Sequence, residues 1–209
     1  MIELKQVRKS YGLNGVLDIE YFKLSTGIFW VSGKNGSGKS TLLKIMAGIL
    51  AFEGDVLLDE TLSVKRNPIK FRRLVNFAEA EPVFPGFLTG QDLIKLFSSA
   101  KSAPKAQEKY FIEKMNMSDY LRDPIGTYSS GMLKKLSLAL AFLGKPRLIL
   151  LDEPLTTIDS DSLEALYGVI GDLHMEGNVT FILASHQHVE RSLLSTKKIL
   201  LKDRRLVIE

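Results

Sequence analysis

The 209-residue sequence predicts an α/β protein with a mostly parallel sheet and a block of helices inserted into it. Two observations carry this prediction. Strand-like and helix-like stretches alternate through the C-terminal third, and strand–helix–strand alternation is typical of a parallel sheet flanked by helices. Residues 90–145 instead have the pattern of successive helices, so we expect them to interrupt the α/β body.

Residues 1–62 alternate short apolar stretches with turns, as strands do. The clearest case is LDIEYFKL, whose alternating apolar and polar residues indicate a half-buried strand. We expect strands at 2–7, 17–24, 27–32 and 55–59, and a helix at 40–50.

The inserted block is expected to hold helices at 90–100, 104–115 and 133–144, with Pro104 suited to a first helical position. In the C-terminal part, apolar runs predict strands and longer mixed stretches predict helices. The expected strands are 148–152, 179–185, 198–202 and 205–208, and the expected helices are 162–177 and 188–194.

Composition limits the possible functions. The absence of cysteine excludes disulfides and thiolate metal sites, and fits a reducing compartment. No run approaches the ~20 apolar residues of a membrane span, and the N-terminal stretch lacks the apolar segment of a secretory signal. The net charge of +4 favours a solvated basic surface over a nucleic-acid or lipid site, although Lys197, Lys198, Lys202, Arg204 and Arg205 cluster in sequence.

The strongest motif is GKNGSGKST, which fits the phosphate-binding pattern G-x-x-x-x-G-K-[ST] between an expected strand and an expected helix. Its glycines permit a backbone that turns N–H groups around a phosphate. Lys39 can reach the β- and γ-oxygens, and Ser40 is the expected Mg²⁺ ligand. A flexible glycine turn is the weaker alternative. The expected nucleotide-binding residues are Gly33, Lys34, Asn35, Gly36, Ser37, Gly38, Lys39, Ser40 and Thr41.

A second motif, LILLDEP, ends a buried strand in two carboxylates. Because ligands bind beyond the carboxyl ends of parallel strands, Asp152 and Glu153 are expected near the phosphates. Asp152 can hold Mg²⁺, and Glu153 can polarise an attacking water as general base. An exposed strand end followed by a turn is the alternative, and the phosphate loop makes it the poorer one.

Four further features join these motifs. YSSGM, residues 128–132, opens an expected helix and so offers a second anion site. His186 follows a buried strand and could contact a γ-phosphate, Asp159 follows Glu153 by a few residues, and the Tyr11 ring could stack on adenine. His174 and His188 are interpreted as structural or exposed.

In this combination the motifs resemble the nucleotide-binding domain of the ATP-binding cassette (ABC) family, over nearly the whole chain. GKNGSGKST resembles the Walker A motif, and LILLDEP the Walker B motif with its following glutamate. YSSGM is similar to the signature LSGGQ and LTTID to the D-loop. His186 matches the switch histidine and Tyr11 the adenine-stacking aromatic.

The resemblance implies a single domain over residues 1–209, with a phosphate-loop NTPase core and an N-terminal antiparallel β subdomain within 1–89 and 146–209. It implies a helical subdomain over 90–145 that carries the signature. It further implies Mg²⁺-dependent ATP hydrolysis, with Glu153, His186 and Lys39 as catalytic residues and ATP and Mg²⁺ as ligands.

In the family, two domains pack head-to-tail and each signature caps the ATP of the other. The resemblance therefore implies that Ser129, Ser130 and Gly131 contact the ATP of a second copy or a homologous ATPase domain, and that Asp159 lies in the D-loop. Ser130 replaces a glycine of the family pattern. Signatures of the form YSxGM favour export slightly.

A further departure lies at Ala80, where the family places a glutamine that ligands Mg²⁺ or orients water; alanine can do neither. Glu79 or Glu81 could substitute if the loop shifts.

The resemblance leaves two function classes open. One is the ATPase subunit of a transporter, peripheral on the cytoplasmic face of the membrane and bound to separate membrane-spanning subunits, with no nucleic acid involved. The other is a soluble ABC ATPase acting on nucleic acid or the ribosome. A small-molecule kinase would leave YSSGM unexplained. Co-purification with a membrane fraction or with RNA would separate the first two.

Overall fold

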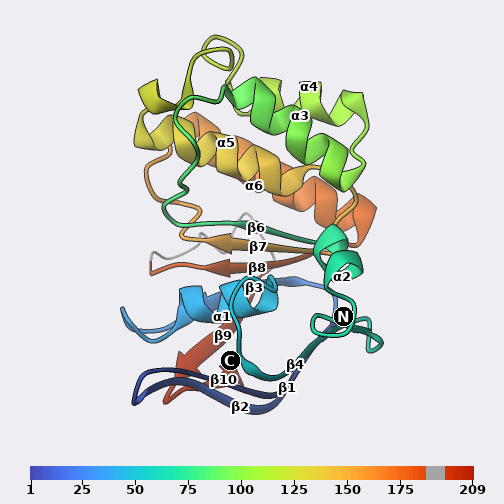
Figure 1. Ribbon diagram of the computed structural model, residues 1–209, viewed down its shortest axis with the longest axis vertical. Helices are drawn as coiled ribbons and strands as arrows, with labels where there is room; N and C mark the ends of the chain where they lie inside the picture. The colour runs from blue at the N-terminus through green and yellow to red at the C-terminus, as the bar shows by residue number, and fades with distance from the viewer. Residues whose placement is uncertain (187–195) are drawn as a thin grey trace.

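The computed structural model describes residues 1–186 and 196–209 (Figure 1). Its larger sheet has six strands in the order β10-β9-β3-β8-β7-β6. The five strands from β9 to β6 are parallel, and β10 joins the edge antiparallel to β9. The bounds are β3 Ile28–Ser32, β6 Val75–Ala78, β7 Leu148–Asp152, β8 Thr180–Ala184, β9 Thr196–Lys202 and β10 Arg205–Ile208.

The smaller sheet is antiparallel and comes from the N-terminal part of the chain, in the order β2-β1-β4-β5. Its strands are β1 Ile2–Tyr11, β2 Asn14–Leu24, β4 Glu53–Leu58 and β5 Leu62–Ser63. The Asp18 amide donates to the Arg204 carbonyl over 2.9 Å, which ties this sheet to the hairpin of β9 and β10.

Helices cover both faces of the larger sheet. Figure 1 places α3 to α6 in a layer on one face and α1 on the other, towards the smaller sheet. Helices α3, α4 and α5 follow β6 and precede β7 in the chain. The bounds are α1 Lys39–Met46, α2 Pro68–Leu74, α3 Gly90–Lys101, α4 Lys105–Lys114, α5 Ser130–Phe142 and α6 Ser160–Gly177, with a short 3₁₀ turn at Ile125–Thr127.

Successive residues of the parallel strands enter two separate cores because strand side chains alternate between the faces of a sheet. Ile149 and Leu151 of β7 pack in the core beneath α3 to α6. Leu148 and Leu150 of the same strand pack in the core around α1 and the smaller sheet. Every residue of β7 and β8 is buried, which explains their continuous apolar runs.

The predicted fold class is confirmed, including the antiparallel N-terminal sheet. Three details differ from the expectation. The helix expected over 40–50 ends at Met46, and the left-handed backbone of Gly48 (φ 71°) follows its end. Pro104 precedes α4 as its N-cap, with an extended ψ of 144°. Residues 63–89, left unassigned, contain α2 and β6. The helix expected at 188–194 and His188 lie outside the described residues.

Candidate functional site

The GKNGSGKST segment forms the connection between β3 and α1. Gly38 is the N-cap of α1 with φ 102°, and a Cβ there would lie 2.7 Å from the Val16 Cγ1, so only glycine fits. Gly36 also has a left-handed backbone (φ 75°). The first N–H groups of α1 have no partner within the helix, so this turn presents donors and a partial positive charge. The local geometry is that of an anion site.

Lys39 is the first residue of α1, and its side chain returns over the loop. Its Nζ donates to the Gly33 carbonyl at 2.9 Å and to the Lys34 carbonyl at 3.2 Å, and the residue is buried. The ammonium is therefore held within the loop by neutral backbone acceptors. A bound phosphate could take their place as an acceptor that is itself charged.

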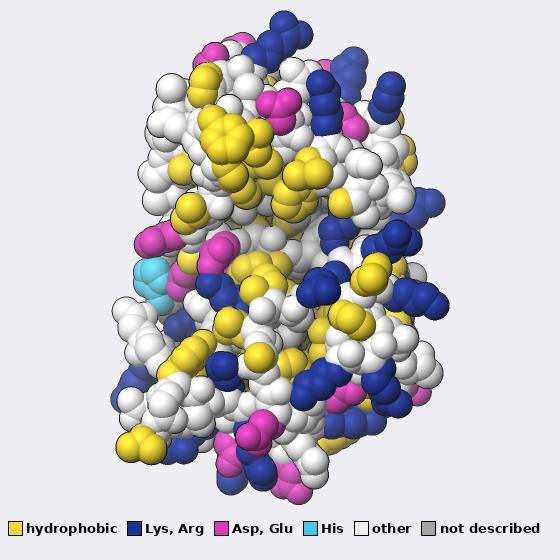
Figure 2. Space-filling view, viewed as in Figure 1, with side chains coloured by type: hydrophobic (Ala, Val, Ile, Leu, Met, Phe, Trp, Pro, Cys, Tyr) yellow, Lys and Arg dark blue, Asp and Glu magenta, His cyan; other side chains and the backbone are white. Residues whose placement is uncertain are grey.

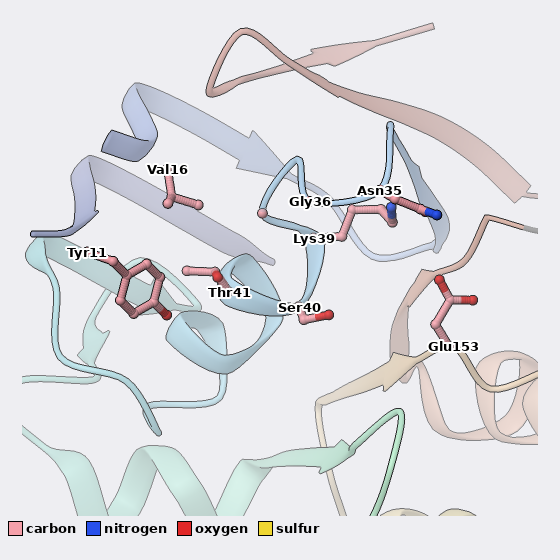
Figure 3. Close-up of a pocket in the computed structure, with 9 residues that line it drawn as sticks. Tyr11, Val16, Asn35, Gly36, Lys39, Ser40, Thr41 and Glu153 are labelled. Carbon is pink, nitrogen blue, oxygen red and sulfur yellow. The ribbon is translucent and has the colours of Figure 1, made fainter. Parts of the chain in front are cut away.

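A cavity of about 420 Å³ extends from this loop. Figure 3 shows Tyr11 at one end of the lining and Glu153 at the other, with Lys39 and Ser40 between them. The Tyr11 ring is half exposed, with the Lys9 Nζ over it at 5.0 Å from the ring centroid, and Val16 provides an apolar neighbour in the lining. The structure thus brings together residues from β1, the phosphate loop and the end of β7, as the sequence predicted. The lining is Tyr11, Val16, Asn35, Gly36, Gly38, Lys39, Ser40, Thr41 and Glu153.

Asp152 is the last residue of β7 and is 2% exposed. Burial raises the pKa of its carboxyl, and the Ser40 side chain opposes that rise. Its Oδ1 is buried without a hydrogen-bond partner. A buried, unpartnered carboxylate oxygen beside a serine hydroxyl fits a hard cation such as Mg²⁺.

Glu153 follows β7 in a left-handed backbone conformation (φ 44°), which is uncommon for a residue with a side chain. Its Oε2 lies 2.9 Å from the His186 Nδ1, and its Oε1 accepts from the His186 backbone N–H at 3.2 Å. His186 comes from the end of β8, so two neighbouring strand ends fix this carboxylate at the mouth of the cavity. The side chain of Glu153 is 19% exposed and can reach water.

The YSSGM segment begins α5, as predicted. Ser129 is the N-cap, and its hydroxyl accepts from the Met132 backbone N–H at 3.2 Å. Ser129 and Ser130 are exposed at this helix N-terminus. These residues do not line the cavity of the phosphate loop. Within the described residues, the structure therefore holds two separate candidate anion sites.

The segment around Asp159 contacts the start of α5. Asp159 is the N-cap of α6 and forms an ion pair of 2.7 Å with Lys135 of α5. Hydrogen bonds from Lys135 and Ser162 hold the pKa of the Asp159 carboxyl well below its usual range. A Cβ added to Gly131 would lie 2.8 Å from the Thr157 carbonyl oxygen, so α5 and this segment pack backbone to backbone.

Ala80 is half-buried in the loop after β6. Glu79 turns its carboxylate to Lys44 of α1.

Lys134 of α5 donates to the backbone carbonyls of Glu79 and Ala80. Burial lowers the pKa of the Lys134 ammonium to about 8, against the opposing effect of nearby carboxylates that include Asp152. The sequence interpretation missed Lys134 and Lys135, and their only signal was two charges inside an apolar helix.

A hollow of about 110 Å³ lies beside this loop, lined by Phe77, Glu79, Pro82, Val83, Phe84, Phe97, Ser137 and Leu140. Val83 and Phe87 of the loop and Leu96 of α3 are exposed apolar side chains. Figure 2 shows hydrophobic side chains gathered over the helical layer on this face. We call Val83, Phe84, Phe87 and Leu96 the apolar loop surface.

His174 lies in the last turn of α6 with its Nδ1 2.8 Å from the Val179 carbonyl, in keeping with a structural role.

In residues 1–186 and 196–209, no helix is long and apolar enough to cross a membrane.

Comparison with known proteins gives consistent matches. The family model described as "ABC transporter" matches residues 21–156. The ribose import ATP-binding protein RbsA of Lacticaseibacillus paracasei is 27% identical over 97% of this chain and 42% of its own length. The zinc uptake system ATP-binding protein ZurA of Listeria monocytogenes is 29% identical over 89% of this chain and 76% of its own length. This chain thus spans less than half of the first relative.

Solved structures show the same fold. An ATP-binding subunit of an ABC transporter superposes with a TM-score of 0.89 at 22% identity, covering 100% of this chain and 89% of that one. The dimeric cassette MJ0796, in a post-hydrolysis state bound to ADP and Pi, superposes with a TM-score of 0.85 at 20% identity, covering 100% and 98%.

Proposed function

Because the chain belongs to the ABC transporter family, we propose that it is the ATP-hydrolysing subunit of a transporter whose membrane-spanning part is formed by separate subunits. The observation that carries this proposal is the convergence of the phosphate loop, the Asp152–Glu153 strand end and Tyr11 around one cavity. Since the matched family and the relatives named above are those of transporters, a role on nucleic acid or the ribosome is not favoured.

In the proposed mode of binding, the triphosphate lies on the loop of residues 33–41 and the adenine lies against the Tyr11 ring. The N–H groups at the start of α1 bind phosphate oxygens, and Lys39 exchanges its contacts with the Gly33 and Lys34 carbonyls for the β- and γ-oxygens. Ser40 and Asp152 would hold Mg²⁺, which when bound neutralises phosphate charge.

Hydrolysis is assigned to the residues at the Glu153 end of the cavity. Glu153 accepts a proton from the attacking water as general base, and the contacts from His186 orient its carboxylate. The His186 ring is half exposed, so it can also turn to a γ-phosphate oxygen. Lys39 stabilises the charge that develops on the transferred phosphoryl group.

The second anion site is explained by a dimer. We assign Ser129, Ser130 and Gly131 to the γ-phosphate of ATP held by a second copy or a homologous domain, with Asp159 beside that interface. The exposure of Ser129 and Ser130, outside the lining of their own chain's cavity, supports this assignment. The proposal keeps the predicted division of the domain. Residues 1–89 and 146–209 form the α/β core with its β subdomain, and residues 90–145 form the helical subdomain that carries the signature.

The apolar loop surface is the proposed contact for the membrane-spanning subunits, which would hold the chain at the cytoplasmic face of the membrane. Large exposed apolar patches mark protein or membrane contacts, and Val83 and Phe87 are 89% and 83% exposed. The named relatives include two uptake systems, so the slight preference for export stays a prediction.

Replacing Lys39 tests the function as a whole. The wild-type chain is expected to hydrolyse ATP with Mg²⁺, and Lys39→Ala is expected to weaken ATP binding as well as turnover because it removes the loop's buried cation. Calorimetry and phosphate release measure the two effects, and thermal melting checks folding. Wild-type affinity in folded Lys39→Ala would contradict the assignment.

Replacing Tyr11 tests the adenine contact. Stacking on a base is worth ~1–3 kcal/mol, so Tyr11→Ala is expected to weaken ATP binding about tenfold. GTP binding should weaken equally, because stacking depends on the flat face of the base and not on the hydrogen-bonding groups that distinguish guanine from adenine. Tyr11→Phe is the matched control and should retain most affinity in titrations. If Tyr11→Ala binds ATP unchanged, the ring makes no stacking contact.

A further inference from the structure

Lys134 is a buried cation whose hydrogen bonds all reach other segments of the chain. It lies in the first half of α5 and is 1% exposed. Its Nζ donates to the backbone carbonyls of Glu79 at 3.1 Å, Ala80 at 2.7 Å and Asp152 at 3.2 Å. An ammonium has three donors, and here each has one carbonyl acceptor.

The three carbonyls join the parts of the molecule that ATP hydrolysis would have to coordinate. Asp152 ends β7 immediately before the proposed base Glu153. Glu79 and Ala80 belong to the loop that continues into the apolar loop surface, and the Glu79 carboxylate also pairs with Lys44 on the phosphate-loop helix. Lys134 itself is five residues from Ser129 in the segment proposed to cap a partner's ATP.

The next residue of α5 strengthens this arrangement. Lys135 pairs with Asp159 at 2.7 Å, on the other side of Glu153 in the chain. The two adjacent lysines therefore attach α5 to Asp152, just before Glu153, and to Asp159, further along the chain. The Ala80 side chain has no polar atom, so at this residue the contact with Lys134 is made by the backbone carbonyl.

We propose that Lys134 is a positioning residue that fastens the loop at residues 79–80 to the end of β7, so that α5, this loop and Glu153 move as one unit. The inference rests on the proposed ATPase function. Removing the ammonium leaves three carbonyls without their donor, and the loop and Glu153 then lose their fixed relation. Because nucleotide binding depends on other residues, the defect is expected in turnover and not in ATP affinity.

The test compares Lys134→Met with a matched variant, Lys101→Met. Lys101 is a half-buried lysine whose pKa burial likewise lowers to about 8, and it donates to the backbone carbonyls of Arg72 and Val75, outside the cavity lining. A misplacement of about 1 Å can cost ~10²-fold in rate, so kcat of Lys134→Met should fall about ten- to a hundredfold. Its KM for ATP should stay within about threefold, and Lys101→Met should keep wild-type kcat.

A rescue experiment separates the ammonium from general packing. Since the chain has no cysteine, Lys134→Cys can be unfolded, alkylated with 2-bromoethylamine and refolded to rebuild a lysine-like amine at this position alone. That protein should regain most of kcat, whereas the same variant alkylated with iodoacetamide should not. Wild-type protein refolded in parallel provides the reference.

Hydrogen exchange gives a readout apart from activity. Backbone amides in 79–84 should exchange faster in Lys134→Met than in wild-type protein or Lys101→Met. Wild-type kcat in Lys134→Met, an equal loss in Lys101→Met, or unchanged exchange in 79–84 would each overturn the inference. A folded wild-type chain that does not hydrolyse ATP would instead contradict the proposed function.

Discussion

Glu153→Gln is expected to abolish ATP turnover while leaving ATP binding intact. Glutamine has nearly the same shape and can still accept the His186 backbone N–H, but its amide cannot take a proton from water. Loss of a positioned general base costs ~10²–10⁴-fold in rate. Phosphate release measures the rate, and calorimetry measures the ATP affinity.

The control is Glu164→Gln, the same change on the exposed face of α6, which should leave the rate unchanged. Near-normal hydrolysis by Glu153→Gln would show that this carboxylate is not the base. The contacts between His186 and Glu153 would then serve a purpose other than orienting a general base.

Ser129→Asp is expected to eliminate hydrolysis without affecting ATP binding by the isolated chain. Aspartate is as good an N-cap as serine, so α5 should form normally. The new carboxylate would face the partner's triphosphate, and like charges across an interface cost several kcal/mol, enough for a loss of about 100-fold or more. The rate is measured over a range of protein concentrations.

Ser129→Asn is the matched control because it keeps the cap and the size of the aspartate without its charge. It should retain far more activity than Ser129→Asp. Equal losses would point to size and not charge, and weaker ATP binding by dilute Ser129→Asp would mean that the segment serves its own chain's nucleotide. Gly131→Asp is less informative, since any Cβ there meets the Thr157 carbonyl of the same chain.

The parts of the site at strand ends were predictable from the sequence because local pattern and topology together fix them. An apolar run that stops at Asp152 predicts both a buried strand and the edge at which its carboxylate lies. The phosphate loop and the start of a helix at YSSGM depend likewise on a few consecutive residues. These elements are confirmed in the fold, while their roles in binding and catalysis stay predictions.

Contacts between distant segments were not predictable in this way. Lys134 meets the Glu79 and Ala80 carbonyls across 55 and 54 positions of sequence, and no local pattern encodes a backbone acceptor so far away. The close packing of Gly131 against the Thr157 carbonyl is likewise a contact between segments far apart in the sequence, and no local pattern predicts it. Helix α2 and strand β6 were missed because each is short, seven and four residues, and neither spans enough turns or alternations to show a period.

Sedimentation of the hydrolysis-deficient chain with ATP and Mg²⁺ tests the central claim, an ATP-driven head-to-tail dimer, most directly. Glu153→Gln should sediment at the 23.4 kDa chain mass without nucleotide and at twice that mass with it. The double variant, which carries Ser129→Asp as well as Glu153→Gln, should stay monomeric while it still binds ATP. A Glu153→Gln chain that stays monomeric when saturated with ATP, or a double variant that dimerises as well as the single one, would contradict the account.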